Sequence, residues 1–137
     1  MRTLAIPFLV LLIAHVAPAE SKRRVIVDIH APRAEIRETL LKHTPVGSSI
    51  GTVVGFISKR LEISGSFSAI RVGPAKAASS PSAAKTIRVY LGQYYKHLGT
   101  VFLTAPMVVH EDVSAQWLFD PNGRLIDIQV DKQARVY

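Results

Sequence analysis

The stretch from Val113 to Val130, VSAQWLFDPNGRLIDIQV, decides the fold of this chain. On both sides of Asp120-Pro121-Asn122-Gly123, apolar side chains alternate with polar ones. Alternation with a period of two is typical of a strand that buries one face. A proline followed two residues later by a glycine is typical of a tight turn. The stretch therefore predicts an antiparallel hairpin of two half-buried strands.

A third strand is predicted upstream of this hairpin. Apolar residues alternate with polar ones from Ile87 to Leu91, which places Arg88 and Tyr90 together on the outward face. The segment around Val101 to Thr104 would add a further strand that ends before Pro106. The sequence thus predicts a sheet of three or four antiparallel strands.

Two short helices are expected before the sheet. Pro32 suits the start of the first helix, and Thr44-Pro45 ends it. Ser48 or Ser49 is a suitable N-cap for the second helix, which is expected to run to Leu61. Its apolar stripe has helical spacing and is expected to pack on the inward face of the sheet. The stripe is Ile50, Val53, Val54, Ile57 and Leu61, and its expected contacts are Val89, Ala115, Trp117, Ile126 and Ile128.

The order of elements defines an α+β fold: two short helices packed on a three- to four-stranded antiparallel sheet. We expect a basic extended lead-in over residues 20–31 and a single domain over residues 32–137. Within that domain, small and polar residues without a period predict a flexible loop over about residues 73–85. Gly51 and Gly55 lie one helical turn apart, and they either admit another backbone closely or weaken the start of the second helix.

The first nineteen residues have the three parts of a secretory signal peptide. Arg2 gives a positive start, Leu4 to Val16 forms an apolar core, and Ala17-Pro18-Ala19 supplies the small residues that a signal peptidase reads. The apolar run is shorter than the roughly 20 residues that span a bilayer. We therefore expect cleavage before Glu20 and a mature domain in the periplasm or outside the cell. The alternative is an uncleaved N-terminal anchor.

The composition narrows the choice of partners. The chain has 17 lysines and arginines against 10 acidic residues, and it has no cysteine. In an exported protein, the positive excess favours anionic envelope components or acidic proteins over nucleic acid, unless it only maintains solubility. Without cysteine there is neither a disulfide nor a lipid attachment point, so packing alone must hold the fold. We expect no transmembrane span after cleavage.

His110-Glu111-Asp112 is the one run of adjacent candidate metal ligands. On a strand, His110 and Asp112 would share a face while Glu111 points to the other face. Two ligands do not make a zinc site, so His97 or His30 would have to contribute a third. A polar strand or loop explains the run equally well, and no motif calls for a cofactor.

A contact surface is expected on the third predicted strand and its continuation. Arg88, Tyr90, Tyr94 and Tyr95 are close in sequence, and tyrosine and arginine are favoured at protein interfaces. The run Lys22-Arg23-Arg24 is a second candidate, because a basic cluster attracts anionic lipid. The alternatives are ordinary packing at the sheet edge and a solvated terminus.

The element order resembles that of the small outer-membrane assembly lipoproteins of the SmpA/OmlA (BamE-like) family and of the β-lactamase inhibitor proteins. The helix Ser49 to Leu61 and the hairpin Trp117 to Ile126 carry the resemblance. Val46-Gly47-Ser48-Ser49 stands where that family opens its key helix, whereas the family's closing leucine-glycine and its lipidated cysteine have no counterpart here. The resemblance implies a binding module of the cell envelope.

These observations favour a non-catalytic exported domain that binds a protein or an envelope component through its sheet. One alternative is a small periplasmic enzyme or metal-binding protein that uses His110, Glu111 and Asp112. Another is a secreted inhibitor or immunity factor. No serine lies in the strand–turn–helix context of a G-x-S-x-G nucleophile, so we assign no catalytic residue.

Overall fold

The computed structural model describes residues 23–63, 71–74, 82–98 and 107–136, and these form an α+β fold. Two helices precede the main sheet: α1 (Arg33–His43) and α2 (Ile50–Lys59). The strands are β1 (Val25–Ile26), β2 (Leu61–Glu62), β3 (Arg71–Pro74), β4 (Lys85–Leu98), β5 (Met107–Phe119) and β6 (Leu125–Val136). Strands β3 to β6 form an antiparallel sheet in chain order, and β1 pairs with β2 in a separate parallel ribbon.

The two helices and an antiparallel sheet of four strands agree with the predicted fold class, but the fourth described strand is β3, which is not the further strand expected around residues 101–104, and some boundaries differ. Leu61, expected on the second helix, lies in β2, because the helix ends at Lys59 and Arg60 caps it. Gly73 and Lys85, expected in a loop, belong to β3 and β4. The strand expected around residues 101–104 lies outside the described residues. The parallel ribbon was not predicted.

The predicted hairpin is confirmed between β5 and β6. The Gly123 N–H donates to the Asp120 carbonyl at 3.0 Å, and the Asp120 carboxylate accepts from the Arg124 N–H at 2.8 Å. Gly123 has φ of 75°, a left-handed conformation that favours glycine. The turn therefore forms as the sequence predicts, and it fixes the register of the two strands.

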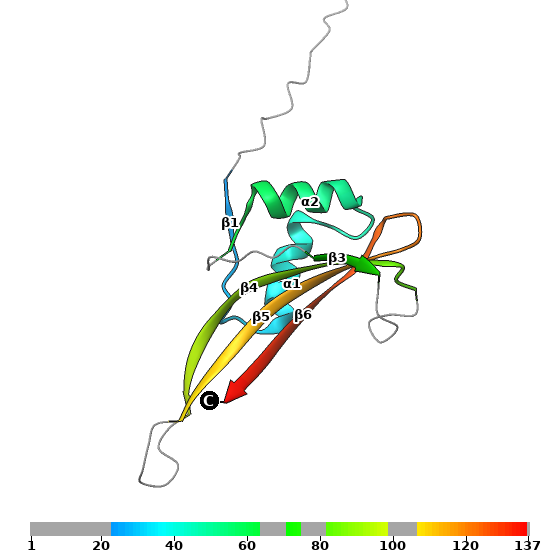
Figure 1. The fold of residues 1–137 in the computed structure, drawn as a ribbon. Coiled ribbons are helices and arrows are strands. Elements are labelled where there is room, and N and C mark those ends of the chain that lie inside the picture. Colours follow the sequence, from blue (N-terminus) through cyan, green and yellow to red (C-terminus); the bar gives the residue numbers. More distant parts are fainter. Residues whose placement is uncertain (1–22, 64–70, 75–81, 99–106, 137) are drawn as a thin grey trace, which may run out of the picture.

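Both helices lie on one side of the curved sheet, and α1 crosses behind β4, β5 and β6 in Figure 1. Ser49 caps α2 by accepting a hydrogen bond from the Thr52 N–H at 3.2 Å. Val53, Phe56 and Ile57 of α2 join Ile36 and Leu40 of α1 in the core. Four of the five predicted contacts of the second helix belong to the same core: Val89, Ala115, Trp117 and Ile128.

The fifth predicted contact, Ile126, is only half buried and is not part of that core. It is the extra residue of an irregularity in the pairing, because Leu118 pairs with Asp127 and Phe119 pairs with Leu125. Leu125 takes the buried position instead. One additional residue thus shifts the inward face by one position at the end of the hairpin.

A second bulge, at Leu91, changes the faces of the long strand β4. Tyr90 pairs with Ser114 and Gly92 pairs with Val113, so Leu91 has no partner in the register. Before the bulge the inward residues are odd-numbered, and after it they are even-numbered. Tyr94 therefore lies on the helix side and is buried, while Tyr95 is 57% exposed on the other side.

The outer edge of β6 is hydrogen-bonded to backbone groups of the segment before α2 and to arginines of α1. The Gly47 N–H donates to the Leu125 carbonyl, and the Leu125 N–H donates to the Ser48 carbonyl, both at 2.8 Å. Further along the strand, Arg37 donates to the Ile128 carbonyl at 3.0 Å and Arg33 donates to the Lys132 carbonyl at 2.9 Å. These bonds fix α1 and the segment before α2 to the sheet.

Gly51 and Gly55 do not bring a second backbone close to α2 within the part of the chain that the structure describes. A Cβ added at Gly55 would meet no atom within 4 Å, and one at Gly51 would meet only the Ser49 hydroxyl at 3.9 Å. Of the two interpretations left open by the sequence, weaker helix propensity is the one that fits these surroundings.

Candidate binding face

The sheet face opposite the helices is polar, and we call it the open face. Its side chains come from all four strands, since in each strand the residues between the buried ones point away from the core. Its exposed and half-buried polar residues are Arg71, Arg88, Tyr90, Gln93, Tyr95, His110, Asp112, Ser114, Gln116, Gln129, Asp131, Gln133 and Arg135. Towards the hairpin the same face continues with Thr86, Leu118 and Asp127, of which Thr86 and Leu118 are buried. No described helix covers it (Figure 1).

One cross-strand row on the open face contains no acidic residue. Arg71 of β3 pairs with Arg88 of β4, Arg88 pairs with Gln116 of β5, and Gln116 pairs with Gln129 of β6. Side chains paired in this way stand close enough to interact. The row therefore presents two guanidinium groups and two primary amides next to one another.

A hollow of about 340 Å³ lies beside this row, and its lining contains three arginines and one acid. Arg71, Arg88 and Arg135 are the cations, and Asp112 is the anion. Asp112 accepts from Arg135 at 3.0 Å and from the Tyr90 hydroxyl at 3.2 Å. Partial burial and the Asp112 carboxylate raise the pKa of Tyr90 above its ordinary value, so its hydroxyl stays protonated and donates.

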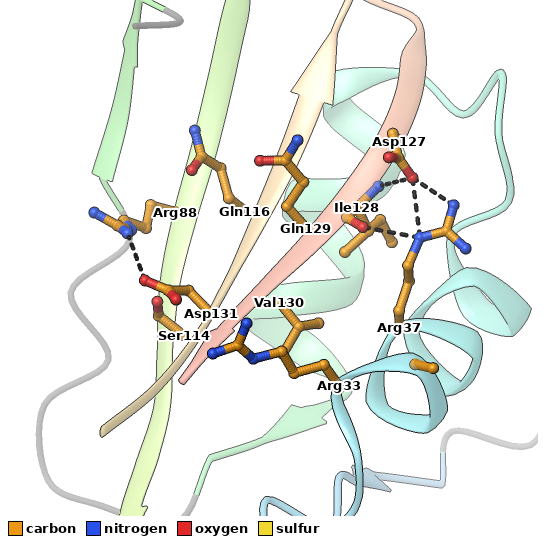
Figure 2. A pocket seen from close by; sticks show the side chains of 11 residues that line it. Arg33, Arg37, Arg88, Ser114, Gln116, Asp127, Ile128, Gln129, Val130 and Asp131 are labelled. Atoms are coloured by element: carbon orange, nitrogen blue, oxygen red, sulfur yellow. Dashed lines mark hydrogen bonds and ion pairs between the residues drawn. The ribbon is translucent and has the colours of Figure 1, made fainter. Parts of the chain in front are cut away.

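A second hollow, of about 500 Å³, adjoins the first and shares Arg88 and Ser114 with it. It lies between the open face and α1, as Figure 2 shows. Arg37 binds Asp127 at 2.5 Å on its helix side, and Arg88 lies 3.8 Å from Asp131 on its sheet side. The amides of Gln116 and Gln129 stand on the sheet floor between these two ion pairs (Figure 2).

The structure brings together only part of the contact surface expected from the sequence. Arg88 and Tyr90 line the same hollow, and Tyr95 lies further along the open face, with its ring 4.1 Å from that of His110. Tyr94 is on the opposite side of the sheet because of the bulge at Leu91. Lys22 lies outside the described residues, and the exposed Arg23 and Arg24 line neither hollow.

Tyr94 belongs instead to a polar cluster on the helix side. Its hydroxyl donates to Glu111, which also binds Lys96 at 2.6 Å. These two contacts hold the pKa of Glu111 below its ordinary value. Lys132, whose pKa is lowered by burial, donates to the carbonyls of Ile29 and Ala31 at 2.9 and 2.7 Å. The cluster joins the segment before α1 to the sheet.

The three candidate metal ligands are divided between these two places. His110 and Asp112 lie on the open face, while Glu111 lies in the polar cluster on the helix side. Within the described ranges, no group of three or more histidine, aspartate and glutamate side chains is arranged to hold a metal ion. His30 contacts Tyr94 at 4.5 Å between ring centroids and Asp28 at 3.3 Å, so it stands on the helix side as well.

Several residues of the open face and of the larger hollow were missed by the sequence prediction. Arg71 lies where the apolar pattern weakens, and Gln133 and Arg135 lie beyond the expected end of the last strand at Val130. Arg33 and Arg37 appear in the sequence only as surface positions of a helix. The available signal was the set of outward-facing residues in each predicted strand. Gln116 and Gln129 alternate with apolar residues, which places them on the outward face together with Arg88.

Comparison with protein-family models, with curated proteins and with solved structures finds no match to this chain. Neither of the two described helices is long and apolar enough to cross a membrane. The geometry of the open face is therefore the basis for a functional proposal.

Proposed function

We propose that this chain is an exported, non-catalytic binding module that binds a protein partner through the open face. The observation that supports the proposal is the pair of adjoining hollows along the open face, the larger of which is bounded on one side by α1. Arginine and tyrosine, which are enriched at interfaces, line these hollows together with amides and a hydroxyl.

The chemistry of the face suits recognition of another polypeptide. The Gln116 amide offers both a donor and an acceptor, which match the backbone amides of a partner. Arg88 and Tyr90 combine a large contact area with directional hydrogen bonds, which is typical of residues that dominate binding energy. The metal-dependent alternative has weaker support, because Glu111 is on the other side of the sheet from His110 and Asp112.

Export is part of the same proposal and has its own test. If the leader directs secretion, the natural protein begins at Glu20, and mass spectrometry of the intact mature chain gives the mass of residues 20–137. A natural protein that retains Met1 or Arg2 in the cytosol would contradict this part alone. The resemblance to BamE-like envelope domains points to the same class of function.

The binding surface is tested by photo-crosslinking in cells that make the protein naturally. We expect a photoreactive phenylalanine at position 116 to give one discrete adduct with the partner. Gln116 belongs to the cross-strand row and also lines the larger hollow. The matched control is the same group at exposed Ser58 on α2. Equal labelling at the two positions, or none at Gln116, would contradict the proposed surface.

A further inference from the structure

We infer that the Arg71–Arg88 pair is a subsite for the carboxylate side chain of an acidic segment of the partner protein. This inference deepens the proposed function and rests on it. The two side chains are in electrostatic conflict. Arg71 and Arg88 are directly paired on neighbouring antiparallel strands, and like charges in that arrangement destabilise a sheet.

The described surroundings relieve this conflict only in part. Arg88 has Asp131 at 3.8 Å, which is a long contact between half-exposed side chains. None of the ion pairs among the described residues includes Arg71. A ligand carboxylate placed between the two guanidinium groups would accept from both and remove the repulsion.

The adjoining hollow has room for such a group and retains a positive excess. Its lining holds Arg71, Arg88 and Arg135 against the single carboxylate of Asp112. Asp112 is already engaged by Arg135 and by the Tyr90 hydroxyl. Its charge is therefore largely satisfied by these neighbours, which leaves Arg71 and Arg88 without a carboxylate partner among the described lining residues of this hollow.

The distribution of charge favours a peptide over a uniformly anionic surface. Asp112, Asp127 and Asp131 lie among the arginines of the two hollows, and each would repel a sheet of phosphate groups. A polypeptide avoids this repulsion, because it can place one acidic side chain at the arginine pair. Its neighbouring amides then reach Gln116, which continues the same cross-strand row.

The test uses the mature chain and a fluorescently labelled peptide of alternating glutamate and glutamine, with binding followed by anisotropy. We expect the double variant Arg71→Gln, Arg88→Gln to lose about tenfold or more in affinity, as removal of charge-assisted bonds implies. The control double variant Lys42→Gln, Lys59→Gln removes the same charge from exposed positions on the helices and is expected to stay within about twofold.

Four results would overturn the inference. They are equal losses in both double variants, absence of peptide binding to the wild type, equal binding of an all-glutamine peptide, and stronger arginine-dependent binding to phosphatidylglycerol vesicles than to the peptide. A second readout does not depend on affinity. Without peptide, Arg71→Gln should raise the melting temperature, because it removes the like-charge pair; an unchanged or lower value would contradict the repulsion on which the subsite is built.

Two combinations of crosslinking and peptide-binding results distinguish a failure of this inference from a failure of the proposed function. If the Gln116 adduct forms equally in the wild type and in the arginine double variant, the open face binds a partner without this subsite. If the Gln116 adduct is absent from both while the glutamate peptide still requires the two arginines, the subsite binds carboxylates but the proposed partner surface is wrong.

Discussion

The side chain of Trp117 has one polar atom, and that atom requires a hydrogen-bond acceptor inside the core. The indole is fully buried, and its Nε1 donates to the Thr44 hydroxyl at 3.0 Å. That hydroxyl in turn donates to the Leu40 carbonyl at 2.9 Å, at the end of α1. Thr44 is itself buried, so water does not replace it. A single threonine thus satisfies the tryptophan and joins the first helix to the middle of the sheet.

Replacing Thr44 with valine keeps the shape of the side chain and leaves the indole N–H without an acceptor. We expect the free energy of unfolding to fall by about 1–3 kcal/mol, which is the cost of a buried unsatisfied donor. Urea denaturation followed by tryptophan fluorescence measures this loss. Thr44→Ser is the control, because it keeps the hydroxyl and should cost less; a valine variant as stable as the wild type would contradict the role of the bond.

At the scale of elements, two glycines have different surroundings. Their replacement by alanine is therefore expected to change the stability of the protein in opposite directions. Gly55 lies inside α2, where an added Cβ meets no atom within 4 Å. Gly123 has φ of +75°, and a Cβ there would lie 3.3 Å from the Ile50 Cδ1 atom. The helix position therefore tolerates alanine, whereas the turn position does not.

We expect Gly55→Ala to stabilise the protein by about 0.5–1 kcal/mol, through helix propensity and a less flexible unfolded chain. Gly123→Ala is expected to destabilise it by about 1–2 kcal/mol, since a left-handed conformation is costly for alanine. Thermal unfolding followed by circular dichroism compares the two variants directly. The same sign of change in both would show that local conformation does not control these positions.

The hairpin and the helix cap were predictable because local rules govern them. Asp120-Pro121-Asn122-Gly123 carries its turn in the residue types themselves, and Ser49 does the same for the start of α2. The faces of β4 were not predicted correctly, because one unpaired residue at Leu91 reverses the alternation beyond it. Gly92, with φ of 147°, is the available signal, since an isolated glycine inside a strand often marks a bulge.

The candidate site was also predictable only where local alternation determines which face a residue lies on. Alternation before the bulge placed Arg88 and Tyr90 on one face, as the structure has them, whereas Tyr94 was added to the contact surface on sequence proximity alone and lies on the other side of the sheet. The pairing of Arg71 with Arg88 depends on the register between β3 and β4, which no local pattern specifies. The parallel ribbon of β1 and β2 joins residues far apart in the chain, so no local pattern predicted it either.

At the scale of the whole molecule, the polar cluster on the helix side couples folding to pH. The contacts of Glu111 with Lys96 and Tyr94 hold its folded-state pKa below the ordinary value of 4.5. Because the unfolded state binds the proton more readily, Glu111 contributes stability that is fully present above pH 4.5. That contribution is lost as the pH falls through the lower pKa of the folded state.

We therefore expect Glu111→Gln to lower the free energy of unfolding at neutral pH and to change it less in acid. Unfolding in urea at a series of pH values from neutral to strongly acidic measures the difference between the two proteins. Glu62→Gln, at an exposed position in β2, is the control and should leave the pH profile unchanged. A difference between Glu111→Gln and the wild type that stays constant with pH would contradict the proposed coupling.

The bonds along β6 have a further consequence for how copies of this protein behave together. A bare strand edge is a template on which a second chain can add, and this is a common start of aggregation. Here the carbonyls of Ile128 and Lys132 are already bonded to arginines of α1, and the backbone of Leu125 is bonded to the segment before α2. An incoming strand would have to displace these hydrogen bonds, which disfavours growth of the sheet from copy to copy through this side.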